Sequence, residues 1–103
     1  MLFVPTDVLN ITLNSNTTGD NNVAIGYNAL QANTTGTRNT VVGGAYALGA
    51  GAATTTGYHN VYIGNDTGGT NTTGSGNAAL GTEAFKLSTT GSHNTAIGDK
   101  ALC

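Results

Sequence analysis

Large apolar side chains are scarce in this sequence of 103 residues. Leu, Ile, Val and Phe together account for 20 residues, whereas Gly, Asn, Thr and Ala account for 61. Such a composition with a high net charge would predict disorder, but the formal net charge is only −2. An ordinary globular core cannot be built from it. The chain must therefore repeat a small motif held together mainly by its backbone, or share a core with other chains.

Other scarcities exclude whole classes of protein. Three fixed positive charges provide no basic surface for a phosphate backbone, so nucleic-acid binding is not expected. The apolar start, residues 1–4, is far shorter than a membrane span, and no basic region precedes it as in a signal peptide. The single cysteine, Cys103, excludes an internal disulfide and a cysteine metal site within one chain.

What the sequence has is a repeat. The triplet Thr-Thr-Gly occurs five times, with spacings of 17, 21, 17 and 17 residues between its glycines. An asparagine always follows three residues after the glycine, an aliphatic residue six after it and a second glycine seven after it. The triplet glycines are Gly19, Gly36, Gly57, Gly74 and Gly91.

The three residues between the asparagine and the second glycine are short and often β-branched, which predicts one brief strand in each repeat. In a strand the first and third residues face one side and the middle residue faces the other. The third residues are predicted to form the core column, so that Ile63→Asp would abolish folding: Ile25, Val42, Ile63, Leu80 and Ile97. The middle residues are predicted to pack between chains of an oligomer: Ala24, Val41, Tyr62, Ala79 and Ala96.

Stacked copies of this unit predict an all-β fold, a parallel β-solenoid of about five coils of about 17 residues. Glycine allows left-handed backbone at the corners. Side-chain amides can bond to their copies one rung away, which predicts a ladder of Asn22, Asn39, Asn60, Asn77 and Asn94. A second short segment repeats Ala29-Leu30, with counterparts at Ala47-Leu48, Ala84-Phe85 and Ala101-Leu102 and a break at Thr67-Gly68. The four extra residues of the second repeat predict a bulged loop within residues 44–54.

The head of the chain differs from the repeats. Leu9, Ile11 and Leu13 alternate with polar residues, a pattern typical of a half-buried strand. We therefore divide the chain into an N-terminal docking or capping strand, residues 1–15, and a repeat domain, residues 16–103. The last coil ends without a polar cap, and the strand could cover such an edge in another copy by strand addition.

Two runs, Asn22 to Leu30 (NVAIGYNAL) and Asn94 to Leu102 (NTAIGDKAL), carry a family resemblance. They resemble the head repeats of YadA-like trimeric autotransporter adhesins, and similar repeats occur in bacteriophage tail fibres. The resemblance covers residues 16–103 and implies a left-handed β-roll, three such rolls around a common axis, and an adhesive outer surface. This chain departs from the family pattern in its longer period, its enlarged second repeat and its third repeat.

Few residues suggest chemistry. His59 and His93 occupy the same repeat slot two coils apart, about 10 Å, which is too far for one shared metal ion. Asp66, Glu83 and Lys100 share another slot. We interpret them as a solvated ladder with a Glu83–Lys100 pair rather than as an acid/base couple. No motif for a nucleophile, a phosphate or a metal is present, so we expect no catalysis and no cofactor.

Other surface features remain open. The Thr-Thr pairs could form a threonine face, although adjacent threonines point to opposite sides of a strand. Tyrosines could contact a receptor, and Asn-x-Thr sequons could carry glycans. The tyrosines are Tyr27, Tyr46, Tyr58 and Tyr62, and the sequons start at Asn10, Asn16, Asn33, Asn65 and Asn71.

These features favour a structural and adhesive fibre segment of a tail fibre, surface adhesin or extracellular filament. Its expected location is extracellular, on a cell surface or on a virion. Its expected partners are further copies of itself, three in all by the resemblance, and a host-surface protein or glycan. The alternative is a threonine-faced β-solenoid that binds ice or a crystalline polysaccharide.

Overall fold

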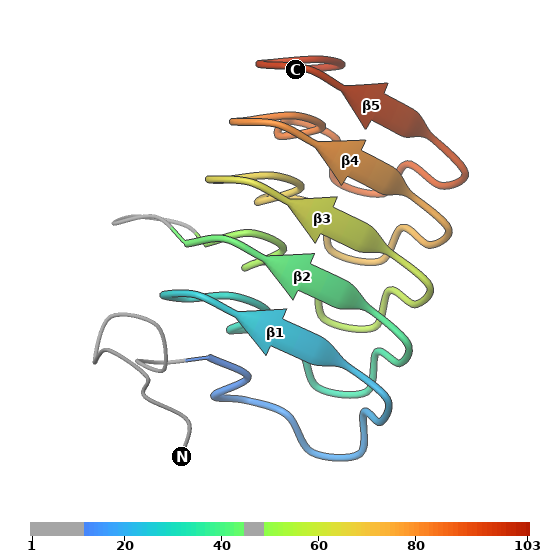
Figure 1. Cartoon of the computed structure of the whole chain (residues 1–103). Coiled ribbons are helices and arrows are strands. Elements are labelled where there is room, and N and C mark those ends of the chain that lie inside the picture. The colour runs from blue at the N-terminus through green and yellow to red at the C-terminus, as the bar shows by residue number, and fades with distance from the viewer. Residues whose placement is uncertain (1–11, 45–48) are drawn as a thin grey trace.

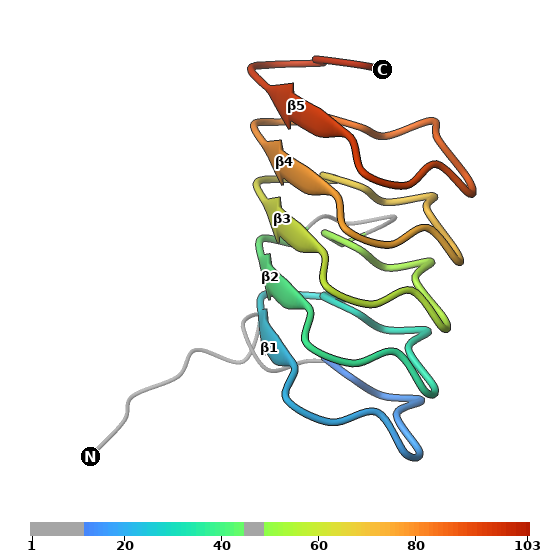
Figure 2. The same ribbon diagram turned by 90° about the vertical axis from the view of Figure 1, so that its right-hand side faces the viewer.

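The computed structural model describes residues 12–44 and 49–103. It contains five strands of three residues that pair in parallel in the order β1-β2-β3-β4-β5, one strand in each coil. The chain makes about four turns from β1 to β5, and the coils stack as similar loops (Figures 1 and 2). The predicted parallel β-solenoid is therefore confirmed. The strands are β1 (Val23–Ile25), β2 (Thr40–Val42), β3 (Val61–Ile63), β4 (Ala78–Leu80) and β5 (Thr95–Ile97).

Strand register follows the sequence repeat. Val23 pairs with Thr40, Thr40 with Val61 and Val61 with Ala78, so each slot of the repeat forms a column along the solenoid. The residues between asparagine and second glycine form the strands, as predicted. Every coil thus places the same slot one rung above its own copy.

The extra four residues lie in the predicted region. In most coils the carbonyl of the second glycine accepts a hydrogen bond from the amide three residues later, as Gly26 does from Ala29. Gly43 instead accepts this bond from Ala50, seven residues later, and the chain then rejoins the common path. The predicted Ala47-Leu48 pair lies outside the described residues, and Ala50-Gly51 fills that slot.

The structure reverses the predicted faces of the strands. The middle residues point into the coil of their own chain, where Val41, Tyr62, Ala79 and Ala96 are buried and Ala24 is partly buried. Residues buried within one chain cannot pack between chains, so that prediction is wrong for the buried four. The third residues, predicted as core, lie on the outside, where Ile63 is 37% exposed and Ile97 70%. The periodicity of two separated the faces, but both were apolar and only the coil's curvature distinguishes inside from outside.

The core is filled by size matching across each coil. The middle strand residue faces the large residue of the second segment, so that small Ala24 shares its coil with Leu30 and small Ala79 with Phe85. Tyr62 shares its coil with Gly68 instead, and a Cβ added at Gly68 would lie 2.8 Å from three atoms of the Tyr62 ring. The repeat therefore has Gly68 in place of a large residue because the Tyr62 ring occupies that part of the core.

The triplet glycines are required for a reason other than the predicted one. They do not have positive φ, but a Cβ at Gly36 or Gly74 would lie 2.3 or 2.0 Å from the carbonyl oxygen of the next triplet glycine. Close stacking of backbone on backbone thus excludes a side chain. Positive φ at glycine is found instead at the second glycine of every repeat, with values of 123° to 136°, as predicted for the corners. Other residues also adopt left-handed backbone, among them Arg38, His59 and Leu30, with φ of 57°, 58° and 48°.

At the N-terminal end, residues 12–15 form a turn and not the end of a strand. Leu13 has a φ of 50°, its amide donates to the Ala29 carbonyl, and its side chain packs against the core. It occupies the same slot as Leu30 one coil earlier. Leu9 and Ile11, the rest of the predicted docking strand, lie outside the described residues. Residues 12–44 and 49–103 contain no helix that could cross a membrane.

The size matching yields a prediction. Gly68→Leu should lower the free energy of unfolding by about 3 kcal/mol or more, because the new side chain overlaps the Tyr62 ring. Tyr62→Ala alone should cost about 3–5 kcal/mol through the cavity that it leaves. The double variant reproduces the Ala24/Leu30 pairing and should recover most of either loss in urea unfolding. Additive losses in the double variant would show that the two residues do not share one core volume.

Candidate interaction surface

The outward residues of β1 to β5 form an apolar surface, here called the outer sheet face. It comprises the first and third strand residues, which are Val23, Thr40, Val61, Ala78 and Thr95, and Ile25, Val42, Ile63, Leu80 and Ile97. The third residues are aliphatic in every coil, and β-branched side chains among them are stiff and lose little freedom on contact. A parallel sheet normally has both faces covered, and soluble monomers rarely expose contiguous apolar surface of this kind. This face therefore has the chemistry of an interface.

Beneath this face the predicted asparagine ladder is present. The side-chain Oδ1 of Asn39 accepts from the backbone N–H of Asn60 at 3.0 Å and from its Nδ2 at 3.1 Å. Asn60 and Asn77 repeat the same pair of bonds. In the first four coils the ladder Nδ2 also donates to the carbonyl of a triplet glycine, as Asn60 does to Gly74 at 2.9 Å. The asparagine and the triplet glycine recur together because they are bonded to each other between coils.

A second polar ladder was not recognised in the sequence. It occupies the slot three residues before each triplet glycine and contains Asn16, Asn33, Thr54, Asn71 and Ser88. Asn33 Nδ2 donates to Asn16 Oδ1 at 2.8 Å, but Thr54 interrupts the amides because its hydroxyl donates to the Asn71 carbonyl. The buried Oδ1 atoms of Asn33 and Asn71 have no hydrogen-bond partner among the described residues. Every residue in this slot is polar, but the slot contains three different residue types, and for this reason the ladder was not predicted from the sequence.

The two threonines of each triplet have different roles. The first donates its hydroxyl to the backbone of the next coil, as Thr17 does to the Thr34 carbonyl at 3.0 Å and Thr72 to that of Thr89 at 3.0 Å. The second threonines form one exposed column of Thr18, Thr35, Thr56, Thr73 and Thr90. The flat surface of the molecule, the outer sheet face, is mainly aliphatic and not threonine-rich.

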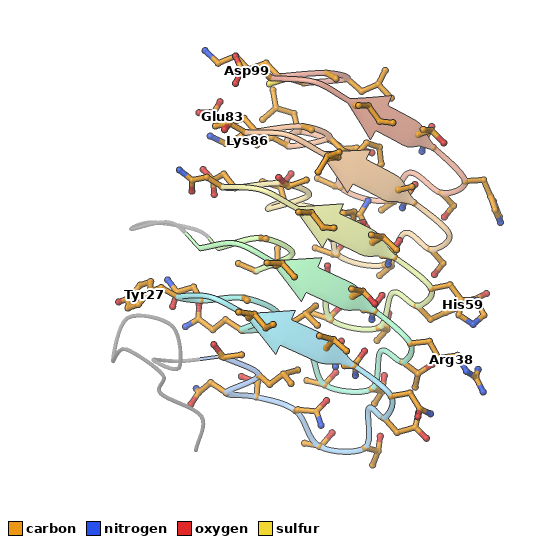
Figure 3. The ribbon with its side chains drawn as sticks, in the orientation of Figure 1. Tyr27, Arg38, His59, Glu83, Lys86 and Asp99 are labelled. Carbon is orange, nitrogen blue, oxygen red and sulfur yellow. The ribbon has the colours of Figure 1, made fainter. Side chains whose placement is uncertain are left out.

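A corner at the exit of the strands carries a charge cluster. Lys86 Nζ lies 3.1 Å from Asp66 Oδ2 and 3.5 Å from Glu83 Oε2, and Figure 3 shows Lys86 beside Glu83. The hydrogen bond with Asp66, followed by the nearby charges of Asp66 and Glu83, raises the pKa of Lys86 above its usual value. The predicted Glu83–Lys100 ion pair is not among those found in the described part of the chain. The slot is still a ladder of charges, but Lys86 bridges its two carboxylates.

The other candidate residues are dispersed. His59 precedes β3 and His93 precedes β5, which keeps them two coils apart, and residues 12–44 and 49–103 bring together no three side chains suited to a metal. The sequons at Asn33 and Asn71 are buried and closed to glycan attachment in the folded chain, whereas Asn16 and Asn65 are exposed. The Asn10 sequon and Tyr46 lie outside the described residues.

The four tyrosines have different environments. Tyr62 is buried and its ring stacks on Phe85 with centroids 6.3 Å apart, while Tyr58 is 52% exposed and Tyr27 is partly exposed. Burial raises the pKa of Tyr62 to about 12. Of the tyrosines considered as receptor contacts, Tyr58 is the one most open to solvent among those that the structure describes.

Comparison with known proteins returned no match: no family model, no curated protein and no solved structure is similar to this chain.

The asparagine ladder predicts a large and position-dependent effect. Asn60→Ala should lower the free energy of unfolding by about 3 kcal/mol or more, because it leaves the buried backbone N–H of Asn77 and the Gly74 carbonyl without partners. Asn94→Ala, in the less buried last described coil, should cost less than half as much. Denaturant unfolding of both variants measures this difference. Equal losses would show that burial of the ladder does not set its energy.

Tyr62 predicts a specific alkaline transition. The folded chain disfavours the phenolate, so the stability that depends on this group is complete below the ordinary pKa of about 10 and is lost as pH rises toward 12. The free energy of unfolding should fall between pH 10 and 12. The fall should be shallower in Tyr62→Phe, which cannot ionise there. An identical slope in both proteins would assign the alkaline loss to other groups.

Proposed function

We propose that this protein is a structural and adhesive fibre segment without catalytic activity, in which several copies associate through the outer sheet face. The observation that carries the proposal is the aliphatic column Ile25, Val42, Ile63, Leu80 and Ile97, which lies on the outside although the chain has few large apolar residues. A sequence with a scarce supply of such residues places them where only a partner can cover them. Each coil contributes one, so the column extends along the whole sheet.

Further copies of the same chain are the partner that fits this surface. The residues of the column are separated by the rise from one coil to the next, and a second copy offers aliphatic side chains at the same spacing. Five strands of three residues cover only about 24 by 10 Å, which is small beside the roughly 800 Å² per partner of a stable interface. A closed ring of three chains lets each copy bury residues on both sides of its column, which favours a trimer over a dimer. This arrangement agrees with the resemblance to YadA-like head repeats and tail fibres.

The rest of the proposal follows from the surface that association would leave open. The corners and the threonine column would face outward, where a receptor on a host surface could contact them. A fibre of this kind would act outside the cell, on a cell surface or on a virion. Ice or crystalline polysaccharide binding is the alternative, and the exposed column of second threonines is what favours it. Freezing-point hysteresis of the purified protein tests that alternative directly.

Two substitutions to aspartate separate association from folding. Ile63→Asp should leave the far-ultraviolet circular dichroism spectrum and the unfolding midpoint close to those of the wild type, because the carboxylate points to solvent in the single chain. It should convert the oligomer to a monomer in analytical ultracentrifugation at micromolar concentration. This outcome replaces the expectation, made from the sequence, that Ile63→Asp abolishes folding.

Ala79→Asp is the matched control on the neighbouring strand. Its carboxylate would enter the buried core, at a cost of several kcal/mol against a total stability of about 5–15 kcal/mol, so this variant should unfold. A monomeric wild type would overturn the proposed association. Unfolding of Ile63→Asp would show that the outer sheet face is part of the core.

A further inference from the structure

The corner at which the chain enters each strand contains two slots with defined structural roles. This entry corner consists of the two residues before each ladder asparagine. In the first slot a hydroxyl accepts the backbone N–H of the preceding coil, as Ser75 Oγ does from Tyr58 at 3.0 Å and Ser92 Oγ from Ser75 at 2.9 Å. The second slot has left-handed backbone, which Asn21 and Gly76 adopt at low cost.

Three residues of the second and third coils depart from these roles. Tyr58 stands in the hydroxyl slot, but its side chain is 52% exposed. Arg38 and His59 place long side chains on left-handed backbone, with φ of 57° and 58°. The fold does not require these side chains, because other coils fill the first slot with Asp or Ser and the second with Asn or Gly, although His93 occupies the second slot of the fifth coil.

The three residues lie at the same edge of the solenoid, on two successive coils. Figure 3 shows Arg38 and His59 projecting from the same edge on successive coils, opposite the edge that carries Glu83 and Lys86. The ring of Tyr58 meets that of His59 edge to face, with centroids 5.3 Å apart and an interplanar angle of 76°. This contact orders the two rings on the coil that follows that of Arg38.

The charges of the corner favour an anion. Lys86 is paired with carboxylates, but Arg38 is exposed and forms no salt bridge within the described residues. A guanidinium binds a carboxylate or sulfate through two parallel hydrogen bonds. Asp20 lies on the opposite side of Arg38 from His59, one coil earlier, where the Arg38 amide donates to the Asp20 carbonyl. An anion is therefore best placed between Arg38 and the Tyr58-His59 pair, away from Asp20.

We propose that the entry corner of the second and third coils binds an acidic saccharide. Its carboxylate or sulfate is held by Arg38, a sugar ring packs against the exposed ring of Tyr58, and His59 offers a further hydrogen bond. The inference rests on the proposed adhesive function and assigns it a receptor chemistry. The aromatic ring can contact any sugar, whereas the unpaired cation favours a sugar that carries an acidic group.

The test measures binding of 3′-sialyllactose, a heparin disaccharide and neutral lactose to the full chain by isothermal titration calorimetry. The variants take their new residues from the same slots of other coils: Arg38→Asn from the first coil and Tyr58→Ser from the fourth and fifth. Such substitutions suit the backbone, so their unfolding midpoints should match or exceed that of the wild type. Lys100→Asn, which removes an exposed cation at the other corner and takes its residue from Asn28, is the control.

The wild type should bind at least one acidic saccharide and not lactose. Arg38→Asn and Tyr58→Ser should each weaken binding by about tenfold or more, and Lys100→Asn should leave it unchanged. Preference for one acidic probe identifies the acid as carboxylate or sulfate. Absence of binding to both acidic probes, equal binding of lactose, or equal loss in Lys100→Asn would overturn the inference.

The oligomeric mass of the same samples keeps this inference separate from the proposed fibre. Saccharide binding by a monomeric wild type would support the binding site at the entry corner and overturn the proposed association of chains. An oligomer that binds neither acidic probe would overturn the corner alone.

Discussion

Hydrogen bonds between successive coils fix one distance, the rise from each coil to the next, and the rest of the structure is adjusted to it. The amide of Val23 reaches the Asn39 carbonyl at 2.8 Å, and that of Ala78 reaches Asn94 at 2.9 Å. A backbone can repeat these bonds only if every coil follows the same path. The triplet glycines are the positions at which this condition restricts the sequence most, because a Cβ at Gly74 would lie 2.0 Å from the Gly91 oxygen.

The constant rise makes each residue the neighbour of its own copy, and this decides which side chains are tolerated. Asparagine stacks well because its amide donates to one neighbour and accepts from the other, as in Asn39, Asn60 and Asn77. Like charges stack badly, and where Asp66 and Glu83 succeed each other Lys86 lies between them. Inside the coil, volume must be balanced within each rung, so large Tyr62 is accompanied by Gly68.

The sequence predicted the features that depend on period. The five strands, their parallel stacking, the position of the enlarged coil and the asparagine ladder all follow from slots that recur in register. The sequence could not show which strand face was inside. Ala24 and Ile25 are both apolar, and the direction in which the coil closes depends on the positions of positive φ, which are held by the second glycines and by residues as different as Arg38, Glu83 and Leu30. The second polar ladder escaped notice because Thr54 and Ser88 replace asparagine there. Tyr58 and His59 are neighbours in the sequence, but the edge-to-face contact of their rings and the edge that His59 shares with Arg38 could be described only from the fold.

The direction of the backbone hydrogen bonds has a mechanical consequence. These bonds run along the stacking direction. A pulling force applied along that direction therefore breaks the bonds between two coils one after another, instead of loading all of them at once in shear. Adjacent coils would separate in succession, each releasing about 17 residues, or about 58 Å of extended chain. Side-by-side chains joined through Ile25, Ile63 and their equivalents would share that load across the bundle. A single solenoid would therefore unfold one coil at a time under an axial force. In an assembly of chains side by side, the same force would be divided among the chains.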